Sequence, residues 1–242
     1  MIRLKRTKAF LLALMLATVT YGQQYDRIVA ELDKIRNSYS DSGYNSYTIR
    51  YQYAMESAPG KVLDTLSAFF RMKGGKYYCR VAQMEFVQDD SINAAIYHNE
   101  KTIVLTNAAI STEKGRLMID SWDSTFVSTN IDSVAVTGNS TNRTLNFYFV
   151  PGSAYGNCSI TYNKETYRPQ KITYVQRATQ NYKEGAEKPD GIIISILFSA
   201  FNKTAFNENL FDYKKFVRRQ NKSWSATADF TSYTIVNNVY VE

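Results

Sequence analysis

Cysteine and histidine are scarce in this chain of 242 residues, which has two cysteines and one histidine. Zinc sites and hydrolase triads need such side chains with defined partners. His98 has no HExxH motif or cysteine cluster around it, so we interpret it as a solvated turn residue rather than a catalytic one. The G-x-S-x-G, Walker A and G-x-G-x-x-G motifs are also absent. We therefore expect a protein that is not an enzyme, with no cofactor and no metal site.

Long apolar runs are lacking as well. The first run, from Ala9 to Val19, is shorter than the ~18 residues that a membrane-spanning helix requires. It follows four basic residues and precedes small ones, which is typical of a cleaved secretory signal peptide over residues 1–22. No cysteine lies near its end, so lipid attachment is not expected there. These features predict a periplasmic or secreted protein with no transmembrane segment after signal removal.

Without the predicted signal peptide, the chain has no strong excess of positive or negative charge. The formal net charge is +7, from 29 Lys and Arg against 22 Asp and Glu. The signal holds four of the basic residues, so 25 remain, and 25 less 22 gives a mature charge of +3. Nucleic acid is therefore not an expected partner. A basic patch near the C-terminus fits anionic lipid headgroups, an acidic partner or a solvated terminus, and consists of Lys214, Lys215, Arg218, Arg219 and Lys222.

The mature chain begins with the periodicity of one amphipathic helix. Ile28, Leu32, Ile35 and Tyr39 follow one another at spacings of four, three and four residues, with polar residues between them. This spacing places all four on one helical face.

Short alternating segments fill most of the rest. Two hairpins are expected, one turning at Gly74-Gly75 and one near Asn99-Glu100. Further alternating strands are expected around residues 47–53, 134–136, 145–149, 158–162 and 172–174. The apolar run from Ile192 to Phe201 is too short to span a membrane and reads as a central strand. The sequence predicts an antiparallel sheet with few helices, a mainly β fold of the α+β class.

The order of these segments resembles the LolA/LolB-like family of periplasmic lipoprotein carriers. The similarity rests on YDRIVAELDKIRNSYSDSGYNSYTIRYQY, AFFRMKGGKYYCRV, LNFYFVPG with CSITYNKETYRPQKITYV, and ISILFSAFNKTAFNENLFDY. It implies a strongly curved antiparallel sheet that forms an incomplete barrel closed by helices, over residues 23–217. Residues 218–242 extend beyond the family's usual end and are expected to form an added strand or a docking tail.

The resemblance also implies a concave apolar face that receives acyl chains. The side chains expected to line this cavity are Phe70, Met72, Ile103, Leu105, Phe147, Phe149, Ile194, Ile196 and Phe198. The same residues would form an ordinary core if helices filled the concavity. The family's lid-closing basic residue belongs at the end of the strand before the first turn, where this chain has Lys73 preceded by Arg71. We expect these two at the lid or at a ligand headgroup.

Two matters stay open. Cys79 and Cys158 are either a disulfide, which an exported chain permits, or two buried free thiols. The protein is either a carrier of a lipid or acylated lipoprotein, or an interaction component of an envelope protein complex with a filled core. The second hypothesis draws on the 18 tyrosines that remain of 19 when Tyr21 is removed with the signal, because tyrosine is favoured at interfaces.

Overall fold

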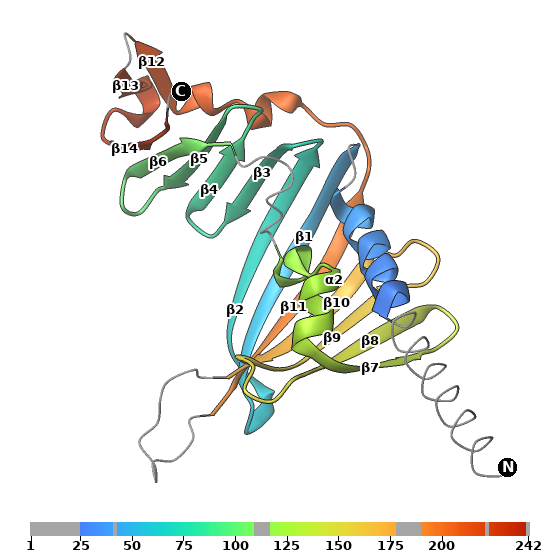
Figure 1. Ribbon diagram of the computed structural model, residues 1–242. Coiled ribbons are helices and arrows are strands. Elements are labelled where there is room, and N and C mark those ends of the chain that lie inside the picture. The colour runs from blue at the N-terminus through green and yellow to red at the C-terminus, as the bar shows by residue number, and fades with distance from the viewer. Residues whose placement is uncertain (1–24, 41–42, 109–116, 178–189, 221–222, 241–242) are drawn as a thin grey trace, which may run out of the picture.

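The computed structural model describes residues 25–40, 43–108, 117–177, 190–220 and 223–240, so the predicted signal peptide lies outside the described residues. One large curved sheet dominates the molecule, and it does not close into a barrel (Figure 1). Its twelve strands follow the order β14-β6-β5-β4-β3-β2-β1-β11-β10-β9-β8-β7, and β12 pairs with β13 in a separate hairpin. The predicted fold class, a mainly β incomplete barrel with few helices, is confirmed.

The chain starts with a helix over residues 25–40 and continues mostly as strands. The elements are β1 (Tyr44–Met55), β2 (Ala58–Lys73), β3 (Lys76–Val81), β4 (Met84–Gln88), β5 (Ile92–Tyr97), β6 (Thr102–Asn107), η1 (Met118–Ser121), α2 (Ser124–Asn130), β7 (Ile131–Gly138), β8 (Asn142–Phe149), β9 (Tyr155–Asn163), β10 (Pro169–Gln176), β11 (Ile192–Asn202), η2 (Glu208–Phe211), η3 (Tyr213–Lys215), β12 (Val217–Gln220), β13 (Ser223–Ala226), η4 (Ala228–Phe230) and β14 (Thr234–Asn238).

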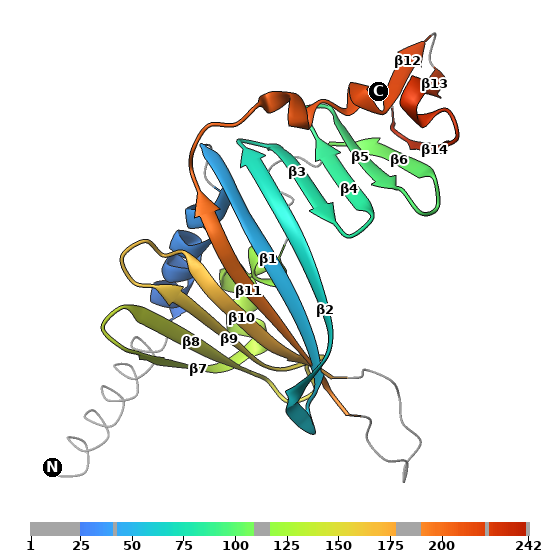
Figure 2. The same cartoon turned by 180° about the vertical axis from the view of Figure 1, so that it is seen from behind.

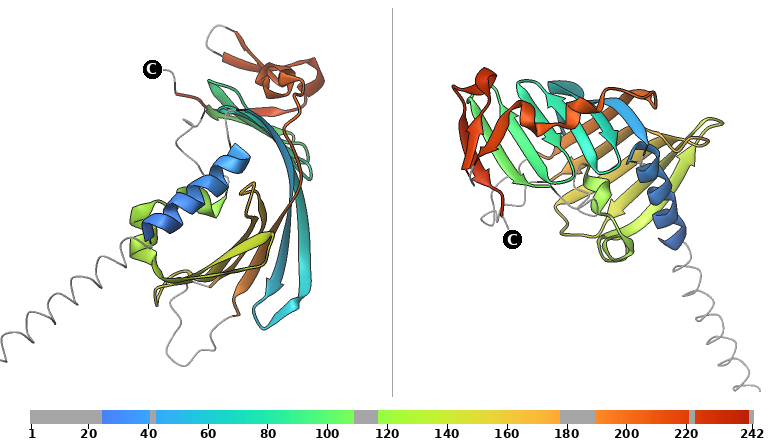
Figure 3. Two further views of the ribbon diagram at one scale, coloured as in Figure 1. Left: turned by 90° about the vertical axis from the view of Figure 1, so that its right-hand side faces the viewer. Right: turned by 90° about the horizontal axis from the view of Figure 1, so that it is seen from above.

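The helix over residues 25–40 forms where its apolar spacing predicts it. Its four periodic residues are 0–5% exposed and belong to one core with the sheet. The helix lies in the hollow of the sheet together with α2, and we call this side of the sheet concave (Figures 1 and 3). We call the core between them the concave core. Because most of the stability of a helix in a protein comes from packing of its apolar face, packing on the sheet stabilises this helix.

Both predicted hairpins are present. Gly74 has φ +58° in the turn between β2 and β3, a left-handed conformation that glycine adopts at little cost. Lys73 pairs with Lys76 across this turn, and Tyr97 pairs with Thr102 across the next predicted turn.

The apolar run that sequence analysis interprets as a central strand is β11, which lies between β1 and β10. Ile194, Ile196 and Phe198 are buried on its concave side, but Ala200, expected on the same face, is exposed. A β-bulge causes the difference: the register against β1 shifts, and Ala200 has φ +54°. Phe201 therefore stacks on Phe198, with ring centroids 6.2 Å apart.

The segment after β11 crosses the ends of the neighbouring strands and reaches the opposite, convex side (Figure 2). There it covers β4–β6 and builds a second core, which we call the convex core. Its buried members are Val87, Ile92, Ala94, Ile96, Ile103, Leu105, Phe216 and Val217. The chain then adds β14 beside β6 in the only parallel pairing that the described strands make. The structure thus places a strand within the C-terminal extension.

Truncation of Leu32 to Ala tests the role of helix packing. Leu32 is 0% exposed, so we expect the free energy of unfolding to fall by about 2–5 kcal/mol, through lost burial and the cavity left behind. Urea unfolding of residues 23–242 measures this change. Asn37→Ala, on the exposed side of the same helix, should change it by less than about 0.5 kcal/mol. Equal effects of the two substitutions would contradict the assigned helix orientation.

Candidate ligand-binding face

The strand register orders the concave side chains into rows that cross the sheet. One row consists of Phe198, Ile49, Ala68, Val81, Met84 and Tyr97. The next row consists of Tyr47, Phe70, Cys79, Phe86, Ala95 and Val104. Each row starts in the concave core and ends on β5 or β6. The rows therefore form one continuous apolar surface.

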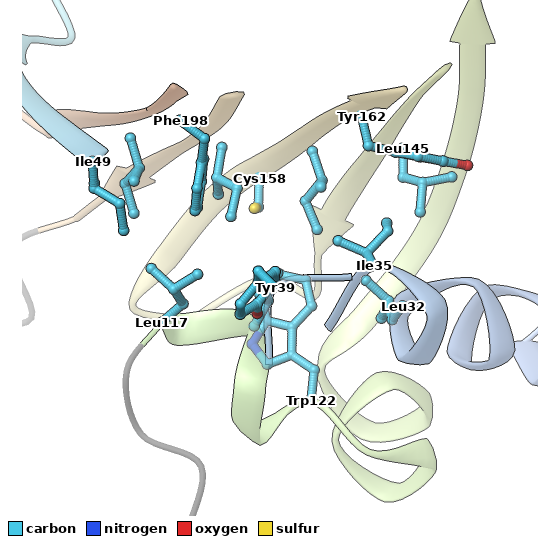
Figure 4. Close-up of a cluster of buried hydrophobic side chains, with 14 of the residues drawn as sticks. Leu32, Ile35, Tyr39, Ile49, Leu117, Trp122, Leu145, Cys158, Tyr162 and Phe198 are labelled. Atoms are coloured by element: carbon cyan, nitrogen blue, oxygen red, sulfur yellow. The ribbon is translucent and has the colours of Figure 1, made fainter. Parts of the chain in front are cut away.

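Protein side chains fill the part of the concave face over β7–β11. Trp122, just before α2, lies 5.1 Å from Phe147 and 5.6 Å from Phe149 between ring centroids. Tyr39 of the N-terminal helix packs 6.2 Å from Phe198. Figure 4 shows Tyr39 and Trp122 facing the side chains of the strands. This part is a packed core.

The far ends of the rows are less well covered. Six apolar side chains on the concave side of β3–β6 are only half-buried, and we call this set the open face: Val81, Met84, Phe86, Ala95, Tyr97 and Val104. On the convex side of the same strands, Val87, Ala94 and Leu105 are 0% exposed. The helix over residues 25–40 and α2 both lie toward the β7–β11 half (Figures 1 and 3). Strands β4–β6 thus carry a half-buried apolar patch on the concave side, whereas their apolar convex side is sealed.

Tyrosines continue the concave surface beyond the open face. Tyr51 and Tyr174 are half-buried, and burial raises the pKa of each to about 12. Tyr155 meets Tyr174 edge to face, with ring centroids 6.0 Å apart. Their hydroxyls stay protonated at neutral pH and present hydrogen-bond donors within an apolar wall.

Seven of the nine predicted cavity residues lie in the concave core. They are 0–9% exposed and consist of Phe70, Met72, Phe147, Phe149, Ile194, Ile196 and Phe198. Ile103 and Leu105 do not join them. Leu105 is the cross-strand neighbour of Ala94, which faces Val87, so both predicted residues point to the convex core.

Alternation on β5 and β6 does not reveal the open face, because the more apolar parity of each strand is buried in the convex core. INAAIY and TIVLTN offer two candidate faces each, and alternation does not say which one lies on the concave side. The presence of apolar residues on both parities was the available signal.

Arg71 and Lys73 do not form a lid over the concavity. Both alternate with Phe70 and Met72, so they point to the convex side, where they hold the segment after β11. The Arg71 guanidinium lies 5.3 Å from the ring centroid of Phe206. Lys73 forms an ion pair with Glu208 and donates a hydrogen bond to the Tyr44 hydroxyl, with Nζ and Oη 3.1 Å apart.

Both cysteines are buried thiols, and they do not form a disulfide with each other. Cys79 lies on β3 and Cys158 on β9, with β2, β1, β11 and β10 between them in the sheet. Burial raises the pKa of the Cys158 thiol well above its ordinary value. A thiol held protonated in this way is a poor nucleophile.

His98 lies in the predicted turn, but it is only partly exposed to solvent. Its side chain is 25% exposed and shares hydrogen bonds with Tyr233 (Nδ1 to Oη, 2.8 Å) and Glu85 (Nε2 to Oε1, 3.1 Å). Tyr78 donates a hydrogen bond to the other oxygen of Glu85 at 3.1 Å. These contacts tie the residue before β14 to the sheet. At the other end of β14, the Asn107 amide pairs with the backbone N–H and C=O of Tyr240 at 2.9 and 3.0 Å.

A polar pocket of about 460 Å³ lies between the N-terminal helix and the segment before α2. Its lining consists of Val29, Asp33, Arg36, Asp120, Ser121, Asp123 and Ser124. The Arg36 guanidinium donates to the carbonyl oxygens of Ile119, Asp120 and Trp122, so it fastens η1 to the helix. Across the described residues, no group of three His, Cys, Asp or Glu side chains could hold a metal ion.

Several solved structures are similar to this chain. One is a LolA superfamily protein from Nitrosomonas europaea, 10% identical over 76% of this chain and 97% of that one, with a TM-score of 0.35. Another is an uncharacterised conserved protein from Thermus thermophilus, 9% identical over 86% and 98%, with a TM-score of 0.48. A third is a putative outer membrane lipoprotein-sorting protein domain from Vibrio parahaemolyticus, 14% identical over 76% and 96%, with a TM-score of 0.32.

A LolA superfamily structure is thus among those that this chain is similar to, as the sequence resemblance leads one to expect. No protein-family model matches the chain, and no curated protein matches it.

The contact between Lys73 and Glu208 predicts an acid-sensitive attachment of the crossing segment. The hydrogen bond between them raises the pKa of Lys73 and lowers that of Glu208. The contribution of Glu208 is therefore present at neutral pH and is lost as the pH falls through its lowered pKa. We expect Glu208→Gln to speed backbone hydrogen exchange in residues 203–216 at pH 7.

Hydrogen exchange followed by mass spectrometry, corrected for intrinsic rates, measures this effect. Acidification should speed exchange of the segment in the parent and much less in the Glu208→Gln variant. Glu165→Gln, at an exposed turn, is the matched control and should behave as the parent. Unchanged protection of the segment in Glu208→Gln would show that the ion pair does not hold it.

Proposed function

We propose that this protein is a non-enzymatic binding protein of the bacterial envelope that holds an apolar ligand, such as a lipid or lipoprotein acyl chain, on the open face. The observation that carries this proposal is the unequal cover of β4–β6. Their convex side chains are sealed beneath the C-terminal segment, whereas concave Met84, Phe86 and Tyr97 keep contact with solvent. Apolar area left half-covered in a concave sheet is typical of a ligand-binding surface.

The chemistry of the open face suits an acyl chain. Burial of apolar area contributes about 0.8 kcal/mol for each methylene group, so a chain of several methylenes gains enough to bind. Met84 is flexible and polarisable, and it adapts to irregular apolar shapes. The Tyr51 and Tyr174 hydroxyls, one or more rows away, suit the ester or amide carbonyls at the polar end of such a ligand.

The envelope location is part of the proposal and rests on the predicted signal peptide. Among the described residues, no helix has the length and apolar character needed to cross a membrane. A carrier role, in which the ligand is passed between membranes or partners, follows from an exported protein with an accessible apolar face.

A second candidate is an interaction component of an envelope complex. The observation in its favour is the packed half of the concavity, where Trp122 and Tyr39 occupy the space that a ligand would need over β7–β11. On this hypothesis, a partner protein covers the open face.

Phe86→Asp tests ligand binding at the open face. A carboxylate in the middle of the row would be desolvated by an acyl chain, so we expect at least a tenfold loss of affinity for a fluorescent fatty acid. Ser199→Asp, on the exposed convex side of β11, is the matched control and should bind as the parent. Binding is followed by fluorescence titration of residues 23–242, and folding by circular dichroism.

Undiminished binding by folded Phe86→Asp would reject the open face as the site. Native mass spectrometry separates the two candidate functions. A parent protein that carries no lipid after detergent-free purification, and takes up no added fatty acid or phospholipid, would favour the interaction component.

A further inference from the structure

Four basic residues gather in one short stretch of the C-terminal segment. Lys214 and Lys215 end η3, and Arg218 and Arg219 lie in β12. We call them the basic cluster. Between the two pairs, Phe216 and Val217 are 7% and 0% exposed in the convex core. The buried pair anchors the stretch to the sheet, so the basic side chains on both sides of it are exposed.

No acidic side chain neutralises this cluster in the part of the chain that the structure describes. The ion pairs there involve Arg36, Lys73, Lys76, His98 and Arg143 instead. Asp212 is the acid nearest in sequence, and its carboxylate accepts the backbone N–H of Lys214 at 2.9 Å as a helix cap. Four cations within six residues therefore produce a positive surface with no internal partner.

Aromatic side chains accompany the basic cluster. Trp224 of β13 pairs with Arg219, whose guanidinium lies 5.7 Å from the indole ring centroid. Tyr213 meets the same indole edge to face, with ring centroids 5.9 Å apart. Both aromatic residues are half-buried. Trp and Tyr beside Lys and Arg form the combination that is enriched at the membrane–water interface.

The hairpin that carries Arg218, Arg219 and Trp224 lies beyond β6, at the end of the sheet that holds the open face (Figures 1 and 3). We propose that the basic cluster and Trp224 dock the protein on a membrane surface rich in anionic lipid. The charge complementarity favours anionic headgroups, and the interfacial aromatic pair favours a bilayer over an acidic protein.

Vesicle cosedimentation of residues 23–242 tests this proposal. We expect binding to vesicles with about 30 mol% phosphatidylglycerol in phosphatidylcholine, and little binding to phosphatidylcholine alone. Raising the salt from about 50 mM to about 500 mM should release the protein, because the contacts are screened. Lys214→Glu/Lys215→Glu and Arg218→Glu/Arg219→Glu should each lower the partition coefficient by more than about tenfold. Trp224→Ala should also lower the partition coefficient, but by less than the charge reversals do. This decrease should be the same at every salt concentration.

Lys61→Glu/Lys171→Glu makes the same change in net charge at two exposed positions outside the cluster and is the control. If this control lost as much binding as the cluster variants, the effect would come from net charge and the proposal would fail. Equal binding to both kinds of vesicle, or to neither, would also overturn it, and an acidic protein would then be the better occupant.

The test is independent of ligand binding. The cluster variants should keep the parent's affinity for fatty acid in solution, and Phe86→Asp should keep the parent's affinity for vesicles. Circular dichroism confirms that each variant is folded.

Discussion

Every strand has two sides, and each apolar side must be covered by something. This requirement governs the whole molecule. The segments that cover the sheet lie on its concave side at one end and on its convex side at the other. Over β7–β11 the N-terminal helix, η1 and α2 cover the concave side, and polar pairs such as Thr144 with Thr161 face solvent on the convex side. Over β4–β6 the C-terminal segment covers the convex side instead. One sheet therefore holds two cores on opposite sides, and the transition falls at β2 and β3.

The change of the covered side explains the contacts that the segment after β11 makes with the ends of β1 and β2. A sheet with a single core would not need them. A segment that passes from the end of β11 to the far side of β4–β6 must cross the ends of β1 and β2. Tyr44 and Lys73 stand at those ends and meet Glu208 there, while Arg71 meets Phe206. These are exposed contacts, and surface ion pairs contribute little to global stability. Their effect is to fix the route of the crossing segment, and the buried Phe211, Phe216 and Val217 supply its anchoring.

Local patterns predicted local structure well. The helical spacing ending at Tyr39 and the glycine turn after Lys73 each depend on neighbours in sequence, so both are readable from it. The predictions that were wrong depend on contacts between residues that are far apart in the sequence. Alternation identifies Ile103 and Leu105 as the buried parity of β6, but a segment more than a hundred residues later covers them from the convex side. The bulge at Ala200 had no signal, since alanine rarely adopts positive φ.

Strand β14, the last described strand, protects the edge of β6 from pairing with other protein chains. Without β14, the uncharged and proline-free edge TIVLTN of β6 would present unpaired N–H and C=O groups, which is the usual template for edge-to-edge association. Tyr233 with His98 at one end, and Tyr240 with Asn107 at the other, hold the blocking strand in register by side-chain hydrogen bonds. Such bonds need little apolar burial, and β14 is largely exposed. Strand β14 thus replaces the apolar edge TIVLTN with the shorter and more polar edge TIVNN, and removal of residues 233–242 would leave the buried members of both cores in place while it exposes the β6 edge.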